Sequence, residues 1–390
     1  MTSLERLPRA DELDKQVIDA RTILGLYMAQ MHYFFEAKEA IDPIIDLAMR
    51  HNYKKRLCQI YTILGTYYSF VQEDYPEAFK AFEEALKISA EVKDIITLVL
   101  ASAWFGNALG FYCDFERASN CYQRALDINV AVNNLWGIAV MKSNLAWSSY
   151  YYAGKIDLGF QATLESVRIA EESGDIYSKA WAHNLHGTFC HGKGFLEEAE
   201  KHLLLGVGLC ERINFHSQTA WARLNLGETY FEMGDFSKSK EHYEKSSCLL
   251  DNNRMVPSWA NLAKVGFTRS KVMNREKDVD LESLYAYSRN IKLKVLEGWI
   301  QRYIGEILLN IDDQHLSESE YRIQNAIEAD QRNRMMFNLG RDYALYADFF
   351  KRKGDRLKAR ENLGKTIEIL KECGADGWVA KAEKELATLS

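Results

Sequence analysis

The sequence predicts an all-α solenoid made of about nine helix-turn-helix repeats and a final capping helix. A small residue recurs at intervals of 39 to 42 positions along the chain, at Gly25, Gly65, Gly106, Ala146, Gly187, Gly227, Gly266, Gly305 and Ala347. A regular period of this length is typical of stacked two-helix units. Only four prolines occur in 390 residues, and 47% of the residues are hydrophobic, so long helices around a large shared core are favoured.

The clearest unit lies at residues 221–246. Gly227 lets a second helix approach the first closely, and Gly234-Asp235 marks the turn between them. Tyr243 fills the space between the two helices, next to the small Ser239. This arrangement resembles the tetratricopeptide repeat. The resemblance implies a right-handed superhelix in which the first helix of each pair lines a concave groove.

The spacing inside the units varies in a regular way. A second small residue usually follows the first after 12 positions, as from Gly227 to Ser239. In three units the step is 13 or 14 positions, from Gly65 to Ala78, from Ala146 to Gly159 and from Gly305 to Ser319. We therefore expect an insertion in the turns of those three units.

At the start of the chain, residues 1–11 are expected to be a lead-in, followed by an array over residues 12–376. Leu4 and Leu7 have no upstream hydrophobic partner, so we expect a longer parent chain before Met1. The first repeat is less regular, with His32-Tyr33-Phe34 where a Gly-Asp turn would lie. Terminal repeats are commonly atypical because one of their faces lacks a neighbour.

The second repeat shows the expected turn chemistry. Asp74 is placed to cap the second helix, Pro76 follows in the first turn, and Glu77 completes a capping box. Repeats three and four hold a concentration of aromatic residues that we expect to pack between helices.

Two later segments differ from the regular units. Residues 251–295 form the most degenerate repeat, because Asp278 stands where a small residue is expected after Gly266. We expect a bend or slack in the superhelix there. Residues 377–390 are expected to form a capping helix, since Trp378, Val379 and Leu386 can face the core while the other face is charged.

Composition limits the function classes. The net charge is −6 and the charges are interleaved, so no basic stripe points to nucleic acid. No apolar run approaches the length that spans a membrane, and the N-terminus has acidic residues where a signal peptide would be apolar. Seven cysteines without framework spacing favour free thiols in a reducing compartment. We expect a cytoplasmic protein.

Enzymatic and metal chemistry find weak support. One helix face carries His183, His186 and Cys190 at a spacing that suits zinc ligands. In the other repeats, however, the equivalent positions hold residues that pack against the neighbouring helix. We therefore expect these side chains to belong to the core and predict no metal. The stretch from Gly187 to Gly194 is one residue short of a phosphate-binding loop, and no strand leads into it. No catalytic triad or carboxylate pair is legible, and we predict that the chain is not an enzyme and needs no cofactor.

The concave groove is the better functional hypothesis. Residues that begin the first helices, or follow the close-approach glycine, should face into it. They provide Trp and Arg side chains as anchors, and side-chain amides that can pair with the main chain of a peptide or partner helix. These residues are Asn107, Trp147, Trp181, Asn184, Thr188, Trp221, Glu228, Trp299, Arg302 and Arg341, together with Glu306 and Asp348. The alternative is that Trp181 and Trp221 merely stack on neighbouring helices.

The two ends of the chain carry a narrower resemblance. They resemble the C-terminal repeat array of bacterial proteins that carry class III adenylate/guanylate cyclase and AAA-type ATPase domains upstream. The resemblance lies in Leu4 to Pro8, in the Glu-Ser-Gly-Asp type junctions between repeats, and in Lys371 to Val379 followed by Glu383 to Ala387. The resemblance implies a sensor or scaffold segment of a larger signalling protein, which binds a protein or peptide in its groove. The alternative function is a stand-alone receptor for a small ligand or signalling peptide.

Overall fold

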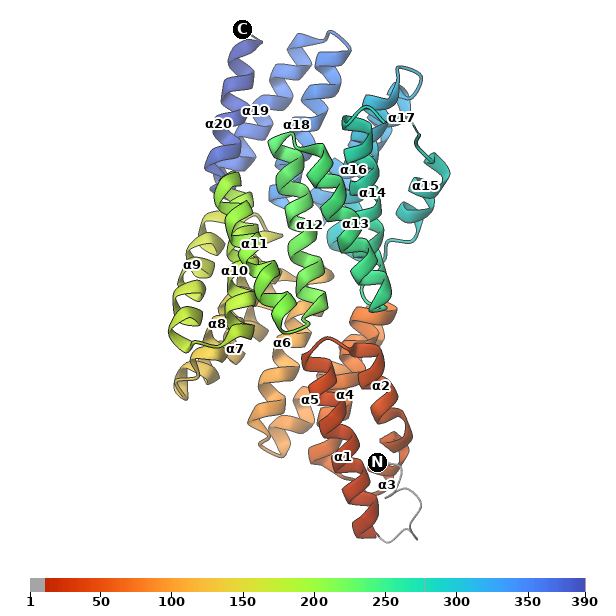
Figure 1. The fold of residues 1–390 in the computed structure, drawn as a ribbon, viewed down its shortest axis with the longest axis vertical. Coiled ribbons are helices and arrows are strands. Elements are labelled where there is room, and N and C mark those ends of the chain that lie inside the picture. The colour runs from red at the N-terminus through yellow and green to blue at the C-terminus, as the bar shows by residue number, and fades with distance from the viewer. Residues whose placement is uncertain (1–10, 277, 390) are drawn as a thin grey trace.

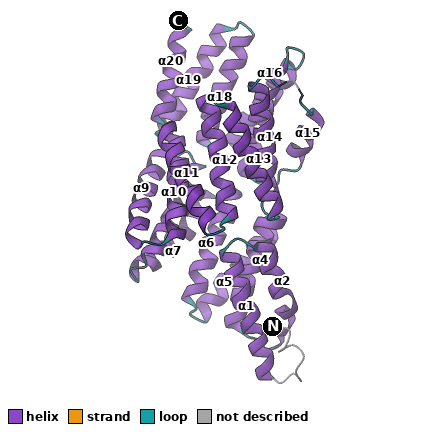
Figure 2. Ribbon diagram, viewed as in Figure 1, coloured by secondary structure: helices purple, strands orange, loops and turns teal. Residues whose placement is uncertain are grey.

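The structure, a computed structural model, describes residues 11–276 and 278–389, and these residues form helices and loops without any strand (Figure 2). The all-α prediction is confirmed. The expected lead-in falls almost entirely on residues outside the described ranges. None of the helices within the described residues is both long and apolar enough to cross a membrane.

The chain begins with α1 (Asp11–Gln30), α2 (Phe34–Ile41), η2 (Asp42–Ile44), α3 (Ile45–Arg50), α4 (Lys54–Tyr67), η3 (Tyr68–Gln72), α5 (Tyr75–Glu91), α6 (Ile95–Phe111), α7 (Phe115–Ala131), α8 (Leu135–Leu145), η4 (Ala146–Tyr151) and α9 (Ile156–Ser173). It continues with α10 (Ile176–Lys193), α11 (Leu196–Arg212), α12 (His216–Met233), α13 (Phe236–Asn252), α14 (Pro257–Met273), α15 (Leu281–Arg289), η5 (Lys294–Leu296), α16 (Glu297–Ile311), α17 (Leu316–Arg332), α18 (Met336–Arg352), α19 (Arg356–Cys373) and α20 (Asp376–Thr388). Consecutive helices pack antiparallel in pairs, and the pairs stack into an elongated solenoid (Figure 1).

Aspartate residues fix where many of these helices begin. The Asp74 side chain accepts a hydrogen bond from the Glu77 amide at the start of α5, as the capping box predicts. The same cap, an aspartate accepting from the amide three residues on, recurs at α6, α7, α10, α13, α15 and α19. Each cap satisfies an amide that the first turn of a helix leaves unpaired.

The close approach of paired helices at the recurring glycines is confirmed. A Cβ atom built on Gly227 would lie 2.9 Å from the Tyr243 ring, and one on Gly106 would lie 2.6 Å from the Tyr122 ring. Both rings are fully buried. The aromatic residue of the second helix therefore occupies the space that a side chain on the first helix would need.

The expectation of inserted turns is wrong for the unit at Gly65, and π-helical segments occur in two of the three units. Residues 68–72 and 146–151 form π-helical segments, η3 and η4, at the ends of α4 and α8. A π-helical turn holds one residue more than an α-helical turn, so the extra residue is absorbed inside the helix. In the other two units the turn after the first helix is four residues long, at residues 152–155 and 312–315.

The superhelix closes on itself, which the repeat pattern alone does not reveal. The backbone amide of Val256 donates to the carbonyl of Phe70, so α14 meets the end of η3. The Lys193 ammonium at the end of α10 contacts both Asp157 and Asp376, and thereby joins α9 and α10 to α20. Side chains from successive turns consequently fill the inner face of the solenoid.

The degenerate segment contains the short helix α15, which buries a single residue, Leu284. This helix stands apart from the stack at the right of Figure 1. The last helix, α20, buries Trp378, Val379 and Ala382. It packs on α19, as a capping helix does, and also contacts α10.

Candidate functional site

Two pockets lie on the inner face of the superhelix. We define the aromatic chamber as a cavity of about 30 Å³ lined by His32, Trp104, Asn107, Trp147, Trp181, Gln218, Trp221 and several neighbours. We define the charged pocket as an open cavity of about 380 Å³ whose walls come from α12, α14, α16, α18, α19 and α20. Aromatic rings close the N-terminal part of the groove, whereas the C-terminal part remains open.

Tryptophan rings form a continuous row through the aromatic chamber and beyond it. The Trp221 and Trp259 rings lie 4.7 Å apart in a T-shaped arrangement, and the Trp259 and Trp299 rings lie 5.7 Å apart. Trp147 contacts both Trp221 and Trp259. Rings from η4 and from the first helices α12, α14 and α16 therefore form one row inside the superhelix.

The charged pocket has a floor of paired ions. Arg269 Nε lies 2.6 Å from Glu306, and Arg269 Nη1 lies 3.4 Å from Glu228. Arg341 contacts Glu232, and its Nη1 lies 3.7 Å from Glu228. Glu228 also accepts a hydrogen bond from the Tyr243 hydroxyl. This network joins α12, α13, α14, α16 and α18 at one point.

The network fixes the charge state of its members. Burial acts to raise the pKa of Glu232, but Arg341, Lys381 and Arg269 together outweigh burial and hold this pKa well below its ordinary value. Burial acts to lower the pKa of Arg341, and the Glu232 and Glu228 carboxylates outweigh it. Glu232, Arg269 and Arg341 therefore keep their charges across the physiological pH range.

Aromatic rings support the cations of the charged pocket. The Arg269 guanidinium lies 3.4 Å from the centre of the Phe231 ring. The Arg341 guanidinium and the Lys381 ammonium lie 4.7 and 5.2 Å from the centre of the Trp378 ring. The Trp378 indole donates to the His191 carbonyl at 2.8 Å, which holds the ring in place. Such rings stabilise cations at little cost in hydration.

A buried acid pair lies behind the pocket. Arg302 Nη1 contacts Asp342 at 3.0 Å, and both side chains are almost inaccessible. Burial and the neighbouring Asp342 carboxyl raise the pKa of Asp330 well above its ordinary value. Burial raises the pKa of Asp342 as well, although Arg302 opposes this shift, so the two carboxyls hold a proton between them.

The rim of the charged pocket is the part that a ligand can reach. Asp348 and Glu385 both contact Lys351, and Lys381 extends over Trp378 from α20. Apolar side chains of α12, α18 and α19, including Phe231, Leu345 and Leu363, lie between these charges. The surface combines apolar area with both signs of charge, which suits a peptide.

The structure divides the residues predicted for the groove into three groups. The charged pocket brings together Arg302, Arg341, Glu306 and Asp348. The aromatic chamber contains Asn107, Trp147, Trp181 and Trp221. The others are buried: Glu228 lies in the ion network beneath the charged pocket, and the rest lie between helices, namely Asn184, Thr188 and Trp299. Closure of the superhelix turns much of the concave face into core, so these residues do not share one continuous cavity.

The histidine face of α10 is part of the packing between helices. His183 Nδ1 lies 2.9 Å from His202 Nδ1, and His186 Nδ1 lies 3.1 Å from the Thr163 hydroxyl. Cys190 belongs to a separate apolar cluster with Leu203 and Tyr230. Across residues 11–276 and 278–389, no group of three His, Cys, Asp or Glu side chains is placed to hold a metal ion.

The stretch that resembles a phosphate-binding loop is helical. Residues from Gly187 to Lys193 belong to α10, and Gly194 ends the helix with a φ of 81°. The amides within the helix are used in its own hydrogen bonds, so they do not form a cradle for phosphate.

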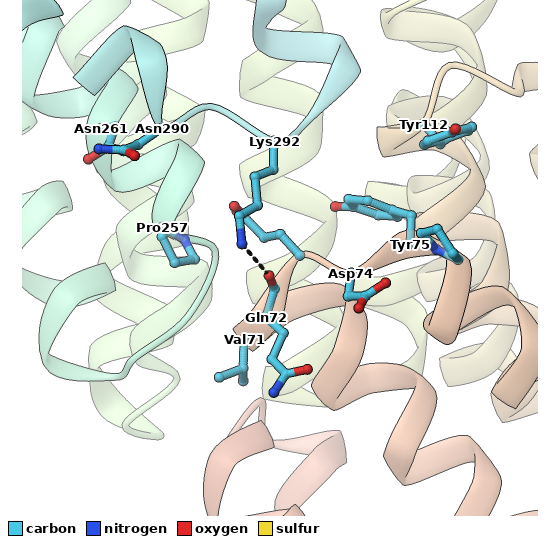
Figure 3. Close-up of a pocket in the computed structure, with 11 residues that line it drawn as sticks. Val71, Gln72, Asp74, Tyr75, Tyr112, Pro257, Asn261, Asn290 and Lys292 are labelled. Atoms are coloured by element: carbon cyan, nitrogen blue, oxygen red, sulfur yellow. Dashed lines mark hydrogen bonds between the residues drawn. The ribbon is translucent and has the colours of Figure 1, made fainter. Parts of the chain in front are cut away.

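A third pocket lies between residues 71–76 and the start of α14, with Lys292 beside it (Figure 3). This junction pocket, of about 750 Å³, has Asn261 and Asn290 on one side and Tyr75 and Tyr112 on the other. Lys292 Nζ donates to the Gln72 carbonyl at 3.0 Å across it.

A buried carboxyl secures the junction. Glu73 accepts hydrogen bonds from the Ser258 amide at 2.9 Å and from the Ser258 hydroxyl at 2.6 Å. Burial raises the pKa of Glu73, although both hydrogen bonds from Ser258 oppose this shift. The backbone of Glu73 and of Val256 is left-handed, with φ of 53° and 40°. Such angles are strained for these residues and persist only where surrounding contacts hold them.

Sequence reasoning missed several residues of the site. Arg269 and Glu232 are central to the charged pocket, yet they lie in ordinary helical positions without a motif. Trp378 was expected to face the core and in fact also lines the pocket. The only signal for His32 was the absence of a normal turn at that place in the first repeat.

Comparison with known proteins identifies the fold. A family model described as tetratricopeptide repeat matches residues 178–247, and one described as anaphase-promoting complex subunit 5 matches residues 24–110. The fold is a tetratricopeptide-repeat superhelix. No curated protein sequence matches the chain.

Solved structures extend this similarity over the whole superhelix. A Rap protein complexed with competence and sporulation factor shares 12% identity at a TM-score of 0.61, over 96% of this chain and 99% of that chain. The Rap conjugation gene regulator of plasmid pLS20, in complex with the Phr* peptide, shares 10% identity at a TM-score of 0.56, over 92% of this chain and 96% of that chain. The apo form of RapI shares 14% identity at a TM-score of 0.50, over 92% and 98%. At these identities the likeness concerns the fold.

Proposed function

We propose that this chain is a non-enzymatic binding scaffold that takes a peptide, or an extended segment of a partner protein, in the charged pocket. The observation that carries the proposal is the pocket itself: an open cavity of about 380 Å³ on the inner face, with a fixed floor of ion pairs and a mixed apolar and charged rim. A rigid, paired floor orients a ligand without requiring it to neutralise a buried charge.

The similar solved structures support a peptide as the ligand. Two of them, each similar to this chain over more than nine tenths of its length, are complexes, one of them described as containing the Phr* peptide. In the proposal, the main chain of the peptide lies against the apolar strip between Phe231 and Leu345, and its charged groups meet Lys381 and Asp348.

The proposal includes a regulatory setting. The resemblance of the chain ends to cyclase and ATPase signalling proteins supports a role as the sensor or scaffold segment of a longer parent, with cyclase and ATPase domains as partners in the same chain. A stand-alone receptor for a signalling peptide or small ligand is the second form of the proposal, which the likeness to the Phr* complex favours. The seven free cysteines support the cytoplasm as the location.

Selection of a short-peptide display library on the full chain tests the proposal. Binding of a selected peptide is then measured by calorimetry for the wild type, for Lys381→Met at the pocket rim, and for Lys358→Met as a control. The two lysine side chains are matched, since they are 57% and 56% exposed. We expect about a ten-fold loss of affinity with Lys381→Met, which corresponds to about 1.4 kcal/mol, and wild-type affinity with Lys358→Met. Equal affinity in all three proteins would show that the selected peptide does not bind in the charged pocket.

A further inference from the structure

A loop of the first repeat inserts into the interior of the superhelix. His32, between α1 and α2, has its imidazole in the aromatic chamber, with the Phe34, Trp104, Phe215 and Trp181 rings at 5.1, 5.0, 5.0 and 5.6 Å. Trp181 and Phe215 belong to repeats far along the chain, so the loop bridges the first and middle parts of the superhelix. Its other link there is a long hydrogen bond of 3.5 Å from the Tyr177 hydroxyl to the Gln30 carbonyl.

The chamber contains polar groups that lack partners. Both imidazole nitrogens of His32, the indole nitrogen of Trp181 and the amide oxygen of Gln218 have no hydrogen-bond partner. Each of these side chains is only 5% exposed. Buried polar atoms are normally paired, so a cluster of unpaired ones around one cavity indicates a place where a further group binds.

We propose that the aromatic chamber is a second binding site, which takes an aromatic side chain of a peptide ligand, and that the His32 imidazole occupies this site in the free chain. This inference rests on the proposed function only in assuming that the ligand is a peptide. Because the aromatic chamber and the charged pocket are different cavities, an experiment can rule out one site and leave the other.

The walls of the chamber define the chemistry of the ligand. The faces and edges of four rings surround the imidazole, an arrangement that accepts another flat ring and disfavours a branched aliphatic group. A neighbouring cavity of about 40 Å³ shares the walls Trp104, Asn107, Asn144 and Trp181. Side-chain amides next to an aromatic cage can pair the main-chain groups that accompany an aromatic residue in a peptide.

The His32 loop is suited to be displaced. His32 has a left-handed backbone with φ of 64°, and its ring is held in the chamber by ring contacts without any hydrogen bond. A ligand ring would recover the ring contacts and add hydrogen bonds. Because the free chain must release His32 before the ligand enters, removing this side chain should strengthen binding.

Replacement of His32 by glycine tests the proposal in the full chain. Glycine keeps the left-handed turn without strain and removes the ring, so the fold should be retained. Lys93→Gly is the matched control, because Lys93 is also left-handed, with φ of 57°, and is exposed. The probes are N-acetyl-tryptophanamide and N-acetyl-leucinamide, with dissociation constants measured by ligand-observed NMR.

We expect His32→Gly to bind N-acetyl-tryptophanamide about ten-fold more tightly than the wild type and the Lys93→Gly control, and more tightly than the leucine analogue. Lys381→Met should leave this binding unchanged, which separates the chamber from the charged pocket. The proposal is overturned if His32→Gly shows no saturable binding, which would leave the chamber as a water-filled void, or if the two probes bind equally. If circular dichroism shows that His32→Gly is unfolded, His32→Asn, which also tolerates the left-handed turn, gives the same decision.

Discussion

Single small residues set the spacing of the helices throughout this molecule. Gly65, Gly106 and Gly227 each face the ring of an aromatic residue on the second helix of the pair, at distances that leave no room for a Cβ atom. These positions were predictable from sequence, because a small residue on the first helix recurs together with a bulky residue on the second helix. The ion pairs of the charged pocket were not predictable from sequence, because they join residues of different repeats and the repeat pattern does not relate those residues to one another.

The glycine contacts predict the effect of one methyl group. Gly227→Ala would place a Cβ atom 2.9 Å from the Tyr243 ring, so we expect a loss of about 1 to 3 kcal/mol in the free energy of unfolding, measured in urea. Gly208→Ala is the control, because nothing lies within 4 Å of its Cβ position on an exposed helical site. It should gain about 0.5 to 1 kcal/mol, and a loss of similar size in both variants would contradict the close-approach account.

The buried ions predict a second effect at the residue scale. Arg269→Met leaves Glu228 and Glu306 without a main partner inside the superhelix, so we expect a loss of about 3 to 5 kcal/mol in urea unfolding. Arg289→Met removes an exposed pair with Glu282 and should cost less than about 1 kcal/mol. Similar small losses would mean that water reaches the floor of the charged pocket.

Buried histidines predict a loss of stability in acid. Burial lowers the pKa of His32, His186 and His191 to about 3, and that of His242 to about 4. Between these values and the ordinary pKa of 6.5, the unfolded chain binds protons that the folded chain excludes, so stability falls as the pH falls through this window.

Each histidine contributes up to about 1.4 kcal/mol per pH unit, and the raised pKa of Asp330 acts in the opposite direction. The net expectation is a lower Tm at pH 5.5 than at pH 7.5 by scanning calorimetry. His186→Asn should reduce this difference, and an unchanged difference would contradict burial of a neutral imidazole at that position.

At the scale of helices, periodicity predicted the pairing well and local irregularity poorly. The N-cap at Asp74 and the core face of α20 follow from short-range patterns and are present, although the Asp74 amide donates to the Tyr68 carbonyl and not to Glu77. The extra residue near Ser69 lies in a π-helical segment and not in the turn that the spacing predicts. The sequence gives the number of residues between two packing positions. Whether an extra residue lengthens the turn or forms a π-helical turn depends on tertiary packing.

The segment around α15 carries a prediction about local stability. Its helix buries only Leu284, whereas α12 buries thirteen residues, so fewer contacts oppose local opening at residues 278–291. We expect amide hydrogen exchange there to be at least about ten-fold faster than in α12 and α13. Uniform protection over α12 to α15 would contradict a flexible element at this point.

At the scale of the whole molecule, closure of the superhelix determines where a ligand can bind. The Glu73–Ser258 junction and the Lys193–Asp376 contact each join residues more than 180 positions apart. These contacts follow from the accumulated twist of many units, which no single repeat encodes, and so the sequence led us to expect an open groove. Closure fills the N-terminal part with tryptophan rings and leaves the charged pocket as the open part of the inner face.

Mapping the contact of a bound peptide tests the central claim most directly. A peptide selected on the full chain is synthesised with a benzophenone group, cross-linked by light, and the attachment sites are found by mass spectrometry. We predict attachment to residues that line the charged pocket, such as Met233, Met273 and Leu345, and loss of attachment when unlabelled peptide is in excess. Attachment confined to the convex faces of the second helices, with the same competition, would contradict a binding scaffold that works through its inner face.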